Sequence, residues 1–184
     1  MNYDITVRES SGLRETIYGF PSAVNHDFFQ ITICGISYCN ETYRIDRKNS
    51  PVSTLEYILD GGGSICLPDG TVFHPTKGDV YFLHQGENHL YYSDVENPWI
   101  KIWFNGSGSY VAQMTQMYHL EHQHWFQNCC IEAEMRNFLS NATDPNLNQT
   151  QIWDENELVF HRILQRLSAS LQHQTPLPDG ARRV

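Results

Sequence analysis

The chain has 184 residues and a net charge of −9, and 40% of its residues are hydrophobic and 12% aromatic. This length and apolar content suit one domain with a short extension and exclude an intrinsically disordered chain. So acidic a segment is not expected to bind nucleic acid by itself, because that affinity comes largely from Lys and Arg. The polar start does not resemble a signal peptide, and no apolar run approaches the roughly 20 residues of a membrane span. We therefore expect a cytoplasmic protein with no membrane partner.

Up to about residue 105, short runs rich in β-branched and aromatic residues alternate with turn signals. The turn signals are Asp60-Gly61-Gly62-Gly63, Pro68-Asp69-Gly70 and Lys77-Gly78-Asp79. Many short strands with closely spaced turns predict a β-barrel or β-sandwich. We expect strands at residues 28–37, 55–59, 64–67, 80–83, 87–92 and 98–104.

The strand expected at 98–104 has two different faces, one apolar and able to pack in a core, the other mixed. A lysine between two tryptophans is unusual for bulk solvent or for a dry core. It favours a cavity in which indole rings stack on a ligand and the ammonium binds a polar group. The alternative is an exposed sheet face, which we weigh lower because paired exposed tryptophans are uncommon. The apolar face carries Ile100, Ile102 and Phe104, and the mixed face carries Trp99, Lys101 and Trp103.

After residue 105 the apolar spacing becomes helical, and three helices are predicted. In the third, Asp154 is expected as the N-cap, with Glu157 completing a capping box and Trp153 packing on Leu158 as a hydrophobic staple. A narrow apolar stripe follows, typical of a helix that packs along one partner. The three stripes are Tyr110, Met114, Met117 and Tyr118, then Ile131, Met135, Phe138 and Leu139, and last Phe160, Leu164, Leu167 and Leu171.

The most informative motif is the segment 78–93, GDVYFLHQGENHLYYS. A Gly-Asp turn leads into an alternating strand, and a histidine opens the next strand after a tight turn. The segment resembles the second sequence motif of the cupin superfamily, with matches at Gly78, Gly86 and His89. His84 replaces the proline of that motif, which only pre-sets a turn.

The order and spacing of elements over residues 28–173 resemble the N-terminal effector domain of AraC-type transcription regulators. The strand ending in Trp103-Phe104-Asn105-Gly106 fits that family's aromatic strand. The resemblance implies a mainly β fold, a cupin-like double-stranded β-helix (jelly-roll) barrel followed by C-terminal α-helices. It also implies an effector-sensing and dimerisation domain that controls DNA binding by a C-terminal helix-turn-helix domain lying beyond this segment.

The same resemblance divides the chain into three parts. Residues 1–105 are expected to form the cupin-like ligand-binding barrel with an N-terminal arm. Residues 106–174 are expected to form a helical subdomain that makes a homodimer, and residues 175–184, TPLPDGARRV, a linker to the DNA-binding domain. The expected dimerisation residues are Phe160, Leu164, Leu167 and Leu171.

In a sugar-binding member of the family, the ligand lies inside the barrel. Here Lys101 and Asp60 stand where that member has other residues, so the effector is expected to be a sugar or a related small polar molecule. His89 shares a strand face with Tyr91, and it either lines the cavity or is a structural histidine. An arm of residues 1–20, with Tyr18 and Phe20, is a candidate cover for the pocket. The expected ligand-binding residues are Ser37, Asp60, His89, Tyr91, Lys101 and Trp103.

No metal is expected in the barrel. Metal-binding cupins take His-x-His and Glu ligands from a first motif, but residues 40–60 contain no histidine, and one imidazole does not hold a metal. A second histidine set, His119, His122 and His124, could offer ligands, although a solvated connection between helices is favoured.

We therefore expect no cofactor and no enzymatic activity. The alternative is a stand-alone cupin enzyme acting on a sugar-like substrate. Such an enzyme could use His89 with Tyr91 or Lys101 as an acid–base pair. The linker-like end and the expected dimer helix favour the sensor over the enzyme.

Overall fold

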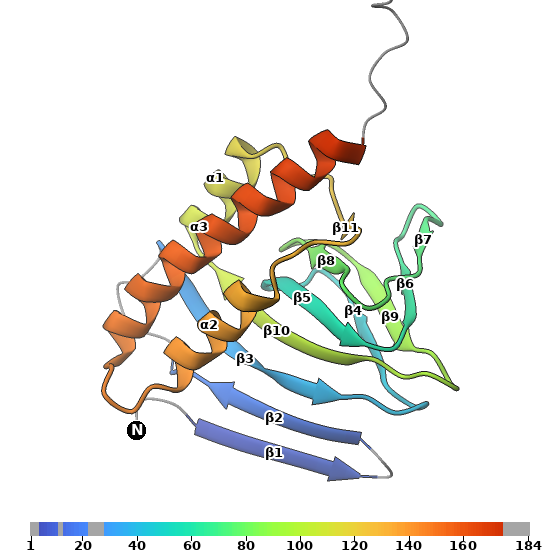
Figure 1. Cartoon of the computed structure of the whole chain (residues 1–184), viewed down its shortest axis with the longest axis horizontal. Coiled ribbons are helices and arrows are strands. Elements are labelled where there is room, and N and C mark those ends of the chain that lie inside the picture. Colours follow the sequence, from blue (N-terminus) through green and yellow to red (C-terminus); the bar gives the residue numbers. More distant parts are fainter. Residues whose placement is uncertain (1–3, 11–12, 22–27, 175–184) are drawn as a thin grey trace, which may run out of the picture.

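In the computed structural model, which describes residues 4–10, 13–21 and 28–174, two antiparallel sheets face each other (Figure 1). The larger sheet has the order β1-β2-β3-β10-β5-β8-β11, and the smaller has the order β4-β9-β6-β7. Helices α1 (Ser109–Met117), α2 (Glu132–Thr143) and α3 (Gln149–Gln174) lie against the outer face of the larger sheet. The strands are β1 (Asp4–Ser10), β2 (Leu13–Gly19), β3 (Gln30–Tyr38), β4 (Arg44–Arg47), β5 (Ser53–Asp60), β6 (Gly63–Cys66), β7 (Val72–Phe73), β8 (Val80–Leu83), β9 (His89–Ser93), β10 (Ile100–Ser107) and β11 (Trp125–Phe126).

The path of the chain between the sheets is that of a jelly roll. From β3 to β10 the chain crosses repeatedly from one sheet to the other, which places β3-β10-β5-β8 opposite β4-β9-β6-β7. Every paired strand in both sheets is antiparallel. Eight strands in two such four-stranded halves define the jelly roll. The expected cupin-like barrel with C-terminal helices is confirmed.

The N-terminal arm extends the larger sheet. β1 and β2 form a hairpin, and β2 pairs with β3, so the arm continues the sheet beyond the jelly roll. The sequence predicts an arm here but no strands. A further strand, β11, lies in the region expected to be helical and pairs with β8. The linker expected at 175–184 lies outside the described residues.

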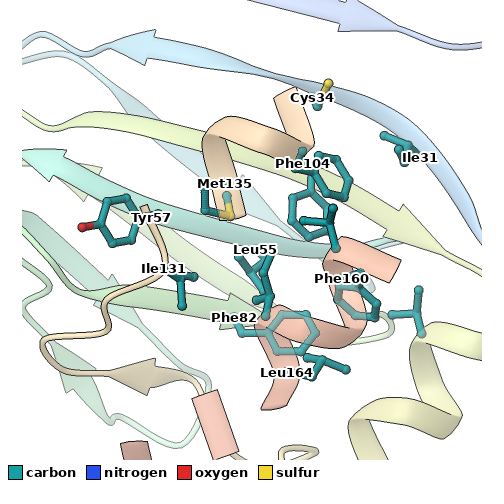
Figure 2. Close-up of a cluster of buried hydrophobic side chains, with 14 of the residues drawn as sticks. Ile31, Cys34, Leu55, Tyr57, Phe82, Phe104, Ile131, Met135, Phe160 and Leu164 are labelled. Atoms are coloured by element: carbon teal, nitrogen blue, oxygen red, sulfur yellow. The ribbon is translucent and has the colours of Figure 1, made fainter. Parts of the chain in front are cut away.

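The helix side of the larger sheet holds the main apolar core, as the alternation in β10 predicts. Phe104 stacks on Phe138 of α2 with ring centroids 4.0 Å apart, and Phe160 of α3 lies 5.9 Å from Phe104. Figure 2 shows Leu55, Phe82 and Phe160 packed around the same cluster. The helices therefore share one core with the sheet.

Helix α3 begins earlier than its sequence suggests. The backbone N–H of Gln151 donates to the Asn148 side-chain oxygen at 3.0 Å, and the Asn148 N–H donates to the Gln151 side-chain oxygen at 3.0 Å. This reciprocal pair is a capping box. The cap expected at Asp154 is wrong, because Asp154 and Glu157 both lie inside the helix. Two polar pairs with the same spacing compete here, and the earlier one starts the helix.

The expected staple and dimer stripe of α3 are placed differently by the structure. Trp153 is buried while Leu158 is 63% exposed, so the two do not form a staple. The stripe is buried within its own chain, where it packs against the barrel, and is not available as a dimer face in this structure. Homodimerisation stays a prediction. Phe160, Leu164 and Leu167 are fully covered, and Leu171 is partly covered.

Candidate functional site

A cavity of about 470 Å³ opens between the two sheets, on the side of the larger sheet that faces away from the helices. Its size is in the range of small-molecule sites. The arm strands β1 and β2 contribute to its walls, as do other strands of both sheets. The side chains that matter for chemistry are Glu15, Arg47, Glu56, Tyr91, Trp103 and Asn105.

Trp103 forms an aromatic wall of this cavity, and its ring is fixed by a buried hydrogen-bond chain. The indole Nε1 donates to Ser37 Oγ at 2.7 Å, and that hydroxyl donates to Glu15 Oε1 at 2.6 Å. Ser37 is fully buried behind the wall, so it orients the indole rather than contacting a ligand. Gly35 leaves room for the ring, since a Cβ there would lie 3.2 Å from Trp103 and 2.2 Å from the Thr16 carbonyl oxygen.

Lys101 lies behind the cavity wall and neutralises Glu56. Its Nζ is 2.5 Å from Glu56 Oε2 and donates to the Tyr81 hydroxyl at 2.9 Å. Burial would lower the pKa of Lys101, but Glu56 and its other neighbours raise it above the usual value, so the ammonium stays charged. Glu56 lines the cavity, whereas Lys101 does not, so the lysine is separated from the cavity by its own counter-ion. Three more aromatic rings surround the ammonium, with centroids at 4.5 Å for Tyr43, 4.8 Å for Tyr91 and 5.4 Å for Trp99.

His89 is buried beside the cavity, with only 2% of its surface exposed. Its ring stacks on Tyr91 at 5.8 Å, and neither ring nitrogen has a hydrogen-bond partner among the described residues. Burial, followed by the charge of Arg47, lowers the pKa of His89 to about 4. Burial also raises the pKa of Tyr91 well above its usual value. Neither group titrates near neutral pH, which disfavours the acid–base pair of the enzyme alternative.

The structure does not bring Asp60 to the cavity. Asp60 is exposed at the end of β5, beyond a register shift between Ile100 and Lys101. The carboxylate that β5 supplies is Glu56, four residues earlier on the inward face. The sequence feature that could have identified Glu56 as a site residue is its position as the single charged residue in the apolar run LEYIL.

The arm contributes one wall of the cavity. Glu15 and Ile17 on β2, with Thr6 and Arg8 on β1, face the cavity. Phe20, expected to help cover the pocket, instead belongs to the core beneath the helices, and Tyr18 packs against that same core.

The histidines outside the barrel make local contacts. His124 Nε2 lies 3.0 Å from Glu87 Oε1, and His84 Nε2 lies 3.2 Å from the Gln123 carbonyl oxygen. Within residues 4–10, 13–21 and 28–174, no group of three or more His, Cys, Asp or Glu side chains is arranged to hold a metal ion. No helix in this part of the chain is both long enough and apolar enough to cross a membrane.

Solved structures similar to this chain have low sequence identity. YhaK from Escherichia coli is 13% identical with a TM-score of 0.44, over 51% of this chain and 44% of that one. An RmlC-like cupin from Shewanella frigidimarina NCIMB 400 is 14% identical with a TM-score of 0.41, over 57% of this chain and 94% of that one.

Comparison by sequence identifies the family of the chain. The Msm operon regulatory protein of Streptococcus mutans serotype c (strain ATCC 700610 / UA159) is 22% identical over 157 residues, which are 84% of this chain and 54% of that protein. The chain thus spans about half the length of this relative. A family model described as AraC-like ligand binding domain matches residues 30–175. The chain belongs to the AraC-like ligand-binding domain family.

Proposed function

We propose that this domain binds a sugar or a similar small polar effector in the barrel cavity, and that binding regulates transcription through a DNA-binding domain elsewhere in the full protein. The observation that carries the proposal is the Trp103 ring, held at the cavity wall by Ser37 and Glu15. The apolar face of a sugar ring can stack on an indole.

The polar groups around that ring support a polyhydroxyl ligand. Glu15 and Glu56 supply acceptors, and Arg47 and Asn105 supply donors. A sugar hydroxyl both donates and accepts, so it can bind between such groups. An exposed charged wall without an aromatic platform would favour an ion instead.

The regulatory part of the proposal follows from linkage. An effector shifts only the equilibrium between states that it binds with different affinity. Trp103 and Phe104 are neighbours on β10, and Phe104 contacts α2, so a shift of this strand reaches the helices. We propose an intracellular, non-enzymatic sensor. A homodimer that serves this regulation would need a surface other than the buried stripe of α3.

A thermal-shift screen tests the proposal. The purified chain would be screened against sugars, sugar acids, sugar phosphates and divalent metals, with Trp103→Ala and the exposed-site control Val95→Ala in parallel. A ligand at a hundredfold excess over Kd adds about 2.7 kcal/mol of stability. We expect a sugar-like compound to stabilise the parent chain and Val95→Ala, to have little effect on Trp103→Ala, and to be recovered unchanged. Equal stabilisation of all three proteins, or conversion of the compound, would contradict the proposal.

A further inference from the structure

We infer that the effector carries an anionic group, a carboxylate or a phosphate, that binds Arg47 and Asn105 at one end of the cavity. This inference rests on the proposed function and narrows the class of effector. Two cations lie at this cavity wall, and only Lys101 has a carboxylate partner, whereas Arg47 contacts a hydroxyl.

Arg47 is a half-buried cation that lines the cavity without a carboxylate partner. Its Nη1 donates to Thr54 Oγ1 at 3.2 Å. No described carboxylate lies within ion-pair distance of this guanidinium, whereas Lys101 has Glu56 at 2.5 Å. A guanidinium in this position has several N–H groups left to donate and no counter-charge. An anionic ligand group supplies both the hydrogen-bond acceptors and the negative charge.

Asn105 presents a second donor beside Arg47. Because Thr54 Oγ1 accepts from Arg47, its own hydrogen points away, to Asn105 Oδ1 at 2.8 Å. That bond fixes the orientation of the amide, so its NH₂ group is the part left to bind a ligand. Asn105 and Arg47 both line the cavity. Two adjacent donors match an acceptor-only group.

The positive charge of Arg47 also acts on its neighbours. It lowers the pKa of His89, after the larger effect of burial, and it partly offsets the rise in the pKa of Tyr43 and Tyr91 that burial causes. Glu56, the carboxylate that β5 brings to the cavity, is paired with Lys101 and not with Arg47. Asp4 and Arg8 on β1 also line the cavity, but they bring one charge of each sign, so the charge of Arg47 is not cancelled, and Glu15 is left to accept from hydroxyls.

Calorimetric titration with matched sugars tests the inference. The probes are D-glucose, D-glucuronate and D-glucose 6-phosphate, with the same three forms of galactose and mannose. On the parent chain, in at least one set an acid should bind about tenfold or more tightly than its neutral sugar. Whether the uronate or the phosphate binds more tightly then assigns the anionic group.

Two variants on the same strand sharpen the test. Arg47→Gln keeps a donor for Thr54 and should reduce the preference for the acid to less than about threefold. Arg44→Gln removes the same charge from an exposed site outside the cavity and should retain the preference. Equal loss in both variants would reduce the effect to overall charge and overturn the inference. The comparison on the parent chain needs neither variant.

The other outcomes separate this inference from the proposed function. A neutral sugar that binds as tightly as its acid, and depends on Trp103, would overturn the inference and leave the proposed function intact. Absence of binding by every acid at concentrations up to about 10 mM also overturns the inference. If no sugar of any kind binds in the broader screen, both fail.

Discussion

Trp103 and Phe104 are consecutive residues of β10, yet they belong to opposite interiors of the molecule. On the helix side, Phe104 stacks on Phe138 at 4.0 Å within a closed apolar core. On the barrel side, Trp103 is held by hydrogen bonds to buried polar groups and faces a cavity. One strand thus separates the residues that stabilise the fold from those that can recognise a ligand. Substitutions on the two faces should have different consequences.

The largest loss of stability is expected on the helix side. Phe104→Ala removes a ring that stacks on Phe138 of α2 and meets Phe160 of α3 edge to face, and should lower the free energy of unfolding by about 4 kcal/mol. Urea unfolding measures this, and the exposed Val95→Ala should stay within about 0.5 kcal/mol of the parent. A loss below about 1.5 kcal/mol for Phe104→Ala would show that this face is not the main core.

Breaking the buried ion pair should be almost as costly, although it lies on the barrel side. Lys101→Met leaves the Glu56 carboxylate buried without its cation and should lower the free energy of unfolding by about 3 kcal/mol. The double variant Lys101→Met/Glu56→Gln should recover at least about 1 kcal/mol, because no charge is left unpaired. Strictly additive losses would mean that the pair does not interact in the folded protein.

His89 should make stability depend on pH. Its pKa is lowered from 6.5 to about 4 in the folded protein, so the unfolded chain takes up a proton first as the pH falls. Stability from this group is complete above pH 6.5 and decreases toward pH 4, by about 2 kcal/mol between pH 7.5 and pH 5.0. Urea unfolding of His89→Gln should lack this part of the pH dependence. Parallel curves for the two proteins would contradict the assigned burial.

The smallest stability effect is expected at the cavity itself. Trp103→Phe removes the indole N–H that donates to Ser37 and should lower the free energy of unfolding by only about 1 kcal/mol. The affinity for the effector found in the screen should fall about tenfold or more, because the stacking platform is smaller and no longer fixed. Calorimetric titration measures that affinity. A stability loss comparable to that of Phe104→Ala would erase the distinction between the two faces.

The sequence was sufficient for the features that depend on local periodicity. Alternation along β10 separated Phe104 from Trp103, and the order of strands and turns predicted the barrel. It was not sufficient to predict which residues the pairing of strands brings to the cavity. Glu56 pairs with Trp103 and lines the cavity, whereas Asp60 lies beyond a register shift at the exposed end of β5.

Other features depend on contacts between distant segments. Arg47 enters the site only because β4 pairs with β9 across from the larger sheet, and no local pattern shows that. The sequence predicts the apolar stripe of α3, but its spacing does not say whether the barrel or a second subunit covers the stripe.

The central claim is that the effector binds on the barrel side of β10. The four tryptophan indole N–H signals in a ¹⁵N-correlated spectrum report on this directly, with Trp103→Phe assigning its own signal. Titration with the effector should shift the Trp103 signal most, and should move the signal of Trp153, buried on the helix side, far less. A titration in which Trp153 shifts and Trp103 does not would place the ligand beneath the helices and contradict the account.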